Sequence, residues 1–336
     1  MTSAAVAWAE FAACAAIIAV AGSALTYYGD AIARLSGLSR TWIGLALIAT
    51  ATSLPELFTG LSSVTVANAP NIAVGDVLGS CVFNLVLLVL LDALCRSEPM
   101  FGRIDQGHVL TAGFGVVLIG FVGALLLFGH SQLQLQFFGV GAYAPLILIL
   151  YLVAMRSMFI YGRRIAPSET LVEEEQKVTL RQAVLRYGLA AAVVAVAGSA
   201  LPFVGVEISD AMGWQTSFVG TLFIAGATSL PEMVVAVTAM RIGATDLAIA
   251  NLLGSNLIDV LILAIDDVAY RKGPLLWSVS PANAISAVAA VIMSGVFIVA
   301  SLYRPDGRIG GWISWVSLCL LAIYLASSYA IYVSGG

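Results

Sequence analysis

The sequence has 336 residues, 60% of them hydrophobic and 10% charged, with a formal net charge of -4. Soluble domains carry about a quarter charged residues, so this composition excludes a soluble domain, and the mean hydropathy of +1.00 places the chain in a lipid bilayer. The 15 Lys and Arg residues are scattered along the chain, which excludes a nucleic-acid-binding surface. The four cysteines have no CxxC spacing, so neither a disulfide framework nor a soft-metal site is indicated.

Long apolar stretches predict the fold class. A spanning helix needs about 20 mostly apolar residues, and the sequence contains ten such stretches. We therefore predict an all-α integral membrane protein with ten transmembrane helices. The stretches begin near Ala5, Trp42, Asn71, Gln106, Ala142, Leu180, Phe218, Thr245, Pro281 and Gly311.

The basic residues predict how the chain is oriented. Only Arg271 and Lys272 fall on one side of the predicted membrane, and all other Lys and Arg residues fall on the other. Cytoplasmic loops carry the excess of Lys and Arg. We therefore expect a multi-pass protein of the cell (inner) membrane, with both termini outside and the charged segment 163–179 in the cytoplasm.

An internal repeat organises the chain. AVAGSAL occurs at 19–25 and again at 195–201, and ATSLPE at 51–56 and again at 227–232. Farther along, GDVLGSCVFN at 75–84 corresponds to ANLLGSNLID at 250–259. Three matches in the same order indicate a duplication.

The duplication divides the chain into a first repeat at 1–162, a cytoplasmic linker at 163–179 and a second repeat at 180–336. Each repeat contains an odd number of predicted spans, so the second copy must enter the membrane from the opposite side. Inverted repeats are typical of secondary transporters, whose substrate site lies near the bilayer midplane between the two copies. We expect the functional site there.

The ATSLPE motif breaks a spanning helix and offers oxygen ligands. Pro55 and Pro231 each remove an N–H donor and clash with the carbonyl four residues back, and a bare carbonyl in hydrocarbon is tolerated where it lines a cavity or binds something. Glu56 and Glu232 follow these prolines directly. Hydroxyl groups precede them at Thr52, Ser53, Thr228 and Ser229. This set of hard oxygen ligands suits Na+ or Ca2+.

The second motif places further polar groups on one helix face. In the first copy Gly79 and Ser80 precede Asn84, which lies four residues after the serine. In the second copy Asp259 lies four residues after Ser255. Residues four apart share a helix face. Since intramembrane carboxylates are costly, Glu56, Glu232 and Asp259 are functional candidates. A purely structural kink would explain one copy, but two matched kinks with adjacent glutamates favour an ion site.

At these residues the sequence resembles the calcium/cation antiporter superfamily, closest to the prokaryotic type of the sodium/calcium exchanger branch. TSLPE at 52–56 and 228–232, with GSxxxN at 79–84 and GSxxxD at 254–259, is similar to the two alpha-repeat signatures of that family. The signatures lie within an alpha-1 motif at 49–84 and an alpha-2 motif at 225–259. The ten-span layout and the outside termini also agree with the family.

The resemblance implies roles for individual residues. Ca2+ would be held by the carboxylates of Glu56 and Glu232 with the backbone carbonyls of Thr52 and Thr228. Asn84 and Asp259 would complete a central polar ring. Flanking Na+ sites would use the same glutamates with Ser53, Ser80, Ser229, Ser255 and the carbonyls near Ala49 and Ala225. Alternating access would come from sliding or rocking of the first and sixth spans, with Gly22 and Gly198 as places for that motion.

Two positions depart from the family pattern. Asp76 stands where the family usually has Asn, as Asn251 does in the second copy, and Cys81 replaces the Asn still present as Asn256. Asp76 would either add an acidic group on the outer approach to the site or cap its helix. His108 and His130 lie near span ends, where we expect them in solvent.

These observations predict a secondary active antiporter that exchanges Na+ for Ca2+ and is not an enzyme. No cofactor is expected, and the partners are the lipid bilayer and the transported small cations. An H+-coupled exchanger of Ca2+ or another divalent cation is the first alternative, because an apolar setting favours the neutral form of a carboxylate. A remote alternative is an intramembrane aspartyl protease that uses Asp76 and Asp259, although it leaves both TSLPE copies unexplained.

Overall fold

The computed structural model describes residues 3–35, 48–95, 100–128, 135–137, 139–165, 178–304, 308–309 and 313–334. The first half contains α1 (Ala4–Leu35), α3 (Ala49–Thr52), α4 (Leu54–Thr65), α5 (Pro70–Leu94), η2 (Met100–Arg103), α6 (Gln106–Phe128) and α7 (Tyr143–Ile165). The second half contains α8 (Leu180–Met212), α9 (Thr216–Val219), the π-helix η3 (Gly220–Ile224), α10 (Ala225–Thr228), α11 (Leu230–Arg241), α12 (Thr245–Ala269), η4 (Leu275–Trp277), α13 (Asn283–Tyr303) and α14 (Trp315–Ser334).

Two short antiparallel hairpins accompany these helices. The strands β1 (Gln136–Phe137) and β2 (Val140–Gly141) pair ahead of α7, with Phe137 opposite Val140. The strands β3 (Arg308–Ile309) and β4 (Ile313–Ser314) pair ahead of α14, with Arg308 opposite Ser314. Each hairpin therefore leads into the last helix of its half.

The described helices confirm an all-α membrane protein. Within the described residues eight helices are long and apolar enough to cross a bilayer, and the bent pair Thr216–Thr228 and Leu230–Arg241 makes a ninth span. The predicted second span begins near Trp42, outside the described residues, and α3 and α4 form its described part. The count of ten spans therefore stays a prediction.

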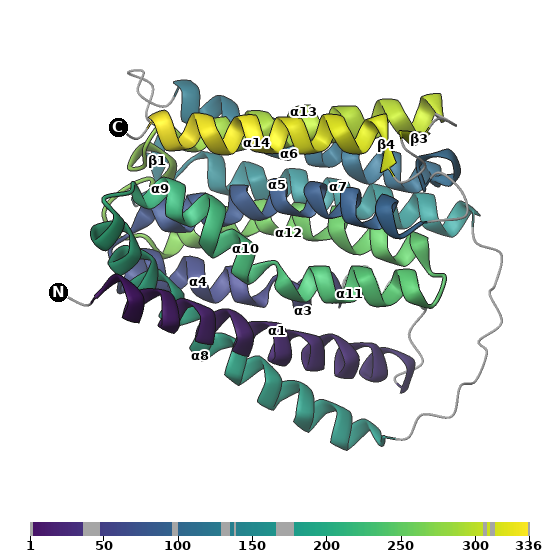
Figure 1. The fold of residues 1–336 in the computed structure, drawn as a ribbon, viewed down its shortest axis with the longest axis horizontal. Helices are drawn as coiled ribbons and strands as arrows, with labels where there is room; N and C mark the ends of the chain where they lie inside the picture. The colour runs from purple at the N-terminus through teal and green to yellow at the C-terminus, as the bar shows by residue number, and fades with distance from the viewer. Residues whose placement is uncertain are drawn as a thin grey trace.

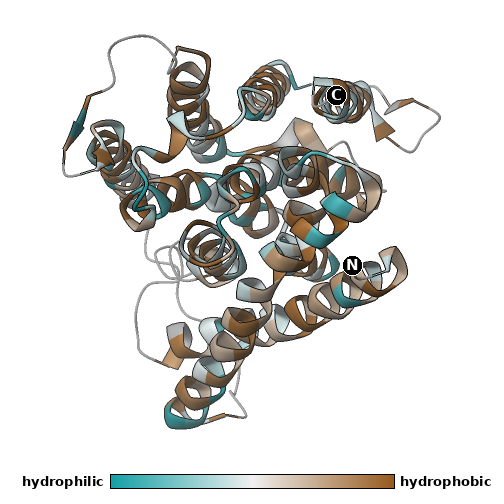
Figure 2. Ribbon diagram, turned by 90° about the vertical axis from the view of Figure 1, so that its left-hand side faces the viewer, coloured by the Kyte–Doolittle hydropathy of each residue, from teal (hydrophilic) through white to brown (hydrophobic). Residues whose placement is uncertain are grey.

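The most enclosed of the candidate spans are α12 and α5, which pack against each other in the middle of the bundle. The helices α1 and α8 lie side by side on one face of the bundle and run in opposite directions (Figure 1). Hydrophobic residues dominate the ribbons when the bundle is viewed from its end (Figure 2). Opposed directions for corresponding helices agree with inverted repeats.

The helices α1 and α8 contact the rest of the bundle at the two proline breaks. A Cβ atom added at Gly22 of α1 would lie 2.3 Å from Cγ of Pro231, and one at Gly198 of α8 would lie 3.0 Å from the carbonyl oxygen of Pro55. Each repeat thus presents a glycine to the broken helix of the other repeat. The absence of a side chain permits this close approach.

Buried aspartates tie the end of one repeat to the other. The Asp267 carboxylate of α12 accepts hydrogen bonds from the backbone N–H groups of Gly141 (2.8 Å) and Leu275 (2.6 Å) and from the Tyr143 hydroxyl (2.5 Å). The Asp92 carboxylate of α5 accepts from the N–H of Ser314 (2.7 Å) and the hydroxyl of Ser317 (2.6 Å). Each aspartate therefore holds the start of the last helix of the opposite half.

Candidate ion-binding centre

The two broken helices adopt the same backbone geometry. The first break lies at Ser53 (φ -84°, ψ 8°) and the second at Ser229 (φ -81°, ψ 7°). Pro55 and Pro231 lie in the first turns of α4 and α11, where the missing N–H needs no helical partner. The axis of the second broken pair bends by 43°, and the helical run is interrupted at the equivalent serine in the first repeat.

The glutamates beside the breaks are buried without adequate partners. Glu56 and Glu232 are each 1% exposed. Neither carboxylate oxygen of Glu56 has a hydrogen-bond partner, and Oε2 of Glu232 also has none. Orphaned buried polar atoms of this kind call for an explanation such as a bound ion.

Hydroxyl groups from both repeats lie near the two glutamates. The Glu56 carboxylate lies near the hydroxyls of Ser80, Thr228 and Ser229, without meeting strict hydrogen-bond geometry. The Ser255 hydroxyl donates to Oε1 of Glu232 at 3.4 Å. Because Thr228 and Ser229 belong to the second repeat and Glu56 to the first, the candidate centre lies at the contact between the two repeats.

Matched contacts connect each break to the GS motif of the other repeat. Thr52 Oγ1 lies 3.3 Å from Ser255 Oγ, and Thr228 Oγ1 lies 3.4 Å from Ser80 Oγ. All four side chains are fully buried. Ser53 Oγ and Ser229 Oγ are buried without partners, which leaves them available to a cation.

The carbonyl groups of Ala49 and Ala225 are already engaged. The Ala49 oxygen accepts from the N–H of Ser53 (3.0 Å) and the hydroxyl of Thr52 (3.1 Å). The Ala225 oxygen likewise accepts from Ser229 N (3.0 Å) and lies 3.2 Å from Thr228 Oγ1, whose single proton has its shortest contact, 2.8 Å, with Asp76 Oδ1. Because a carbonyl oxygen has two lone pairs, a cation at either carbonyl would require the threonine hydroxyl to turn away.

Asn84 and Asp259 lie at the same centre and are each 1% exposed. The Asn84 side-chain amide donates to Oδ1 of Asn256 at 3.0 Å, and the Asn256 amide donates to the carbonyl of Cys81 at 3.2 Å. Asp259 interacts electrostatically with Glu56 and lies 4.0 Å from Cys81 Sγ through Oδ2. The polar ring therefore joins both repeats, and Cys81 lies within it.

Asp76 belongs to this polar network and does not cap its helix. It lies within α5 after the first turn, is fully buried, and accepts a hydrogen bond from Thr228 Oγ1 at 2.8 Å through Oδ1. The capping alternative is therefore wrong. The expectation of a solvated His108 is also wrong, because that residue is 9% exposed and its Nε2 lies 3.2 Å from Asp246 Oδ1; His130 lies outside the described residues.

The motif analysis missed Asp266, which is fully buried with both carboxylate oxygens unpartnered. It follows Asp259 by seven residues on α12, a spacing that keeps it on nearly the same helix face. The cost of an intramembrane charge was the available signal. The repeat does not identify Asp266, because Leu91 occupies the corresponding position of the first copy.

The centre lacks a cluster of metal-binding side chains of the usual kind. Among the described residues no group of three or more His, Cys, Asp or Glu side chains is arranged to hold a metal ion. Any cation here would need hydroxyl, amide or carbonyl oxygens besides carboxylates. That ligand set suits Na+ and Ca2+.

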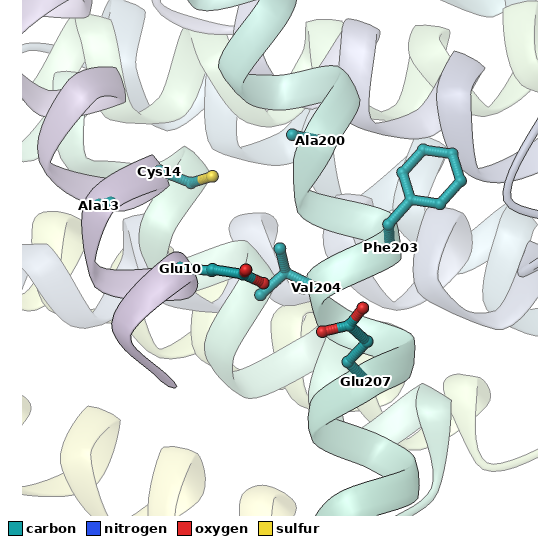
Figure 3. Close-up of a pocket in the computed structure, with 7 residues that line it drawn as sticks. All are labelled: Glu10, Ala13, Cys14, Ala200, Phe203, Val204 and Glu207. Carbon is teal, nitrogen blue, oxygen red and sulfur yellow. The ribbon is translucent and has the colours of Figure 1, made fainter. Parts of the chain in front are cut away.

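A cavity of about 350 Å³ lies apart from this centre, between α1 and α8 (Figure 3). Glu10 and Cys14 line it from α1, and Phe203 and Glu207 line it from α8. Figure 3 shows the two carboxylates pointing into the space between the helices. None of the predicted site residues lines this cavity, so it is separate from the candidate centre.

Known proteins match nearly the whole chain. The family model described as sodium/calcium exchanger protein matches residues 6–165 and 182–330. An uncharacterized membrane protein of Methanocaldococcus jannaschii is 27% identical over 317 residues, which cover 90% of this chain and 93% of that protein. The sodium/calcium exchanger MaX1 of Methanosarcina acetivorans is 25% identical over 272 residues, with 71% and 76% of the two chains covered.

A solved structure of the sodium-calcium exchanger NCX_Mj has the same fold, with a TM-score of 0.60 at 20% identity and coverage of 96% of this chain and 98% of that one. The matched proteins are exchangers and membrane proteins, so the chain is a transporter and the protease alternative is dropped. Since the family model covers both halves, the chain belongs to the sodium/calcium exchanger family.

Proposed function

We propose that the chain exchanges Na+ for Ca2+ across the cell membrane by alternating access, with both termini outside. The observation that carries the proposal is the pair Glu56 and Glu232, buried at the contact between two broken helices with three of their four carboxylate oxygens unpartnered. A buried charge is stable when it is paired or holds a metal ion. Cations supply that pairing here.

The charges of the centre suit competition between the two ions. Two glutamates balance one Ca2+, and with Asp259 the centre holds up to three negative charges, enough for up to three Na+. A centre that binds one set or the other, but not both, couples the two flows. Unequal charges would make the cycle electrogenic, with each net charge moved worth about 2.3 kcal/mol per 100 mV.

In this proposal Ca2+ is bound by Glu56 and Glu232 with the carbonyls of Thr52 and Thr228. Asn84 and Asp259 complete the ring. Na+ binds beside them, at sites that use the glutamates with Ser53, Ser80, Ser229 and Ser255 and the carbonyls of Ala49 and Ala225. The unpartnered hydroxyls of Ser53 and Ser229 support these sites, whereas the engaged Ala49 and Ala225 carbonyls require a local rearrangement.

Proton coupling is the second candidate function. The carboxylates of Glu56, Glu232 and Asp259 are fully buried and interact electrostatically. Like charges in one buried site favour the uptake of protons in place of some cations. Protons could then replace Na+ as the coupling ion in exchange for Ca2+ or another divalent cation.

Radiolabelled Ca2+ uptake into proteoliposomes tests these functions. An imposed Na+ gradient should drive uptake in the unmodified protein, and E56Q or E232Q should abolish it. Glu10→Gln, in the separate cavity between α1 and α8, is the matched control and should retain uptake. Uptake that responds to a pH gradient alone would overturn the sodium assignment, and full activity in E56Q would overturn the site.

A further inference from the structure

Asp266 has a position that the central site does not explain. It is fully buried near the end of α12, and neither carboxylate oxygen has a partner. A Cβ atom added at Gly60 of α4 would lie 2.2 Å from Oδ2 of Asp266 and 2.8 Å from Oδ1. The carboxylate therefore points at α4 and fills the space that a side chain at position 60 would take.

Asp76 lies close enough to Asp266 for the two charges to interact. It is also fully buried, and its Oδ2 has no partner. Asp76 and Asp266 thus lie within electrostatic reach of each other and together leave three carboxylate oxygens unpartnered. Such a pair is costly unless a cation or proton neutralises it.

Three helices place this pair on one side of the centre. Gly60 lies one turn beyond Glu56 on α4, and Asp266 lies two turns beyond Asp259 on α12. Asp76 lies one turn before Ser80 on α5, which runs the other way. All three offsets lead toward the end of the bundle that carries Asn68, whose side-chain oxygen accepts a hydrogen bond from Lys272 Nζ; we call this the Asn68 end.

The repeat-related positions on the other side of the centre do not carry a pair of aspartates. With the offset of 175 residues between the two GS motifs, Asp76 corresponds to Asn251 and Asp266 corresponds to Leu91. Asn251 and Leu91 are both buried, so the fold accepts neutral residues at the equivalent places. The two aspartates are therefore no requirement of the architecture.

We propose that Asp76 and Asp266 form a second binding site for a divalent cation, one helical turn from the centre toward the Asn68 end. Two carboxylates balance the charge of one divalent cation, and Gly60 leaves room for the Asp266 carboxylate. Thr228 connects this site to the centre, since its hydroxyl donates to Asp76 and lies 3.4 Å from Ser80 Oγ. The site goes beyond the proposed function, on which it rests only for the choice of Ca2+ as the ion.

A binding measurement tests the site without transport. In the double variant E56Q/E232Q the central site is disabled, and equilibrium binding of radiolabelled Ca2+ to the detergent-purified protein should retain one ion per chain. Adding D266N or D76N should remove that ion. Adding Asp246→Asn, whose side chain is 76% exposed, should not. Size-exclusion chromatography and thermal unfolding identify variants that fail to fold, and D266L, which places the residue of position 91 at 266, is a second test.

Residual binding that survives both D76N and D266N, or no residual binding in the folded double variant, would overturn the site. If the unmodified protein transports no Ca2+ while D266N removes bound ion, the proposed function fails and the second site stands.

Transport from the two sides gives an independent readout. The KM for Ca2+ presented from the Asn68 end should rise at least about fivefold in D266N, as expected for a coupling of about 1–3 kcal/mol, and the KM from the other end should not change. Right-side-out and everted vesicles separate the two directions. An equal change in the KM from both ends would overturn the divalent site. A changed pH dependence of transport with unchanged Ca2+ affinity would also overturn it and would indicate that the two aspartates share a proton.

Discussion

At the scale of single residues, the Thr228 hydroxyl makes a stronger hydrogen bond to a carboxylate than the hydroxyl of its repeat counterpart Thr52. Both hydroxyls bond to a backbone carbonyl and lie near a serine of the other repeat. The shortest hydrogen bond of the Thr228 hydroxyl, 2.8 Å, goes to the Asp76 carboxylate, whereas Thr52 has only a looser contact with the Glu232 carboxylate. Removal of a partner from a buried acceptor costs about 1–3 kcal/mol.

We therefore expect Thr228→Val to lower the free energy of unfolding by about 1–3 kcal/mol more than Thr52→Val. Valine keeps the shape of threonine and removes only the hydroxyl group. Chemical unfolding of the two variants in the same detergent measures the difference. Equal losses would show that Asp76 gains little from the Thr228 hydroxyl.

The sequence motifs predict most of the residues that meet at the centre. Glu56, Glu232 and Asp259 follow from the repeat and from the cost of intramembrane charge. The cost of charge also applies to Asp266, but the repeat does not mark it, and its contact with Gly60 of α4 is a tertiary contact that no motif records. The proposed ion ligands stay predictions.

At the scale of elements, the glycines of α1 and α8 determine how closely these helices approach the breaks. A Cβ atom at Gly22 would overlap Pro231, and one at Gly198 would press on the Pro55 carbonyl. Overpacking of this kind costs about 1–3 kcal/mol. We expect Gly22→Ala and Gly198→Ala to lower the Ca2+ transport rate by about fivefold or more.

Each of these helices also offers a matched control. A Cβ atom at Gly29 of α1 would meet the Tyr187 ring at 3.4 Å, and one at Gly188 of α8 would meet nothing within 4 Å. Alanine favours a helix over glycine by about 1 kcal/mol, so Gly29→Ala and Gly188→Ala should leave the rate unchanged and the fold intact. Equal losses in all four alanine variants would contradict the role of the close contacts.

The prolines predict the helix breaks, but the π-helix η3 (Gly220–Ile224) has no sequence signal of its own. It packs against α5, where a Cβ atom at Gly79 would lie 2.4 Å from the Thr221 carbonyl oxygen. Single π-helical turns inside α-helices are frequent at functional sites. The π-helix is thus a local feature at a close tertiary contact, and the periodicity of the sequence does not reveal it.

At the scale of the whole molecule, the basic residues predict an orientation that labelling can test. Lys272 is exposed at the Asn68 end, which we expect outside, and Val178, at the end of the linker, is expected in the cytoplasm. In intact cells a membrane-impermeant maleimide should label Lys272→Cys and not Val178→Cys. The reverse pattern would invert the proposed topology, with the fold unchanged.

The repeat predicts two inverted halves, but it does not predict how they are tied together. Asp92 and Asp267 are related by the same offset of 175 residues, and each lies at the end of its helix. Their partners belong to hairpins and helix starts with no repeat signature, at Gly141–Tyr143 and at Ser314–Ser317. The cross-connection thus becomes visible only in three dimensions.

These anchors predict that the two halves depend on each other for stability. Asp92→Asn and Asp267→Asn each place an amide donor where the carboxylate accepts from N–H and O–H groups, so hydrogen bonds to a charged group, worth about 1.5–3 kcal/mol, are lost. We expect each substitution to lower the free energy of unfolding by about that amount, measured by chemical unfolding in detergent. Asp246→Asn should change it little, because the Asp246 side chain is 76% exposed and an ion pair that water screens contributes about 0–1 kcal/mol. If Asp92→Asn and Asp267→Asn were as stable as this control, the anchors would not join the halves, and the contact at the proline breaks would have to hold them together.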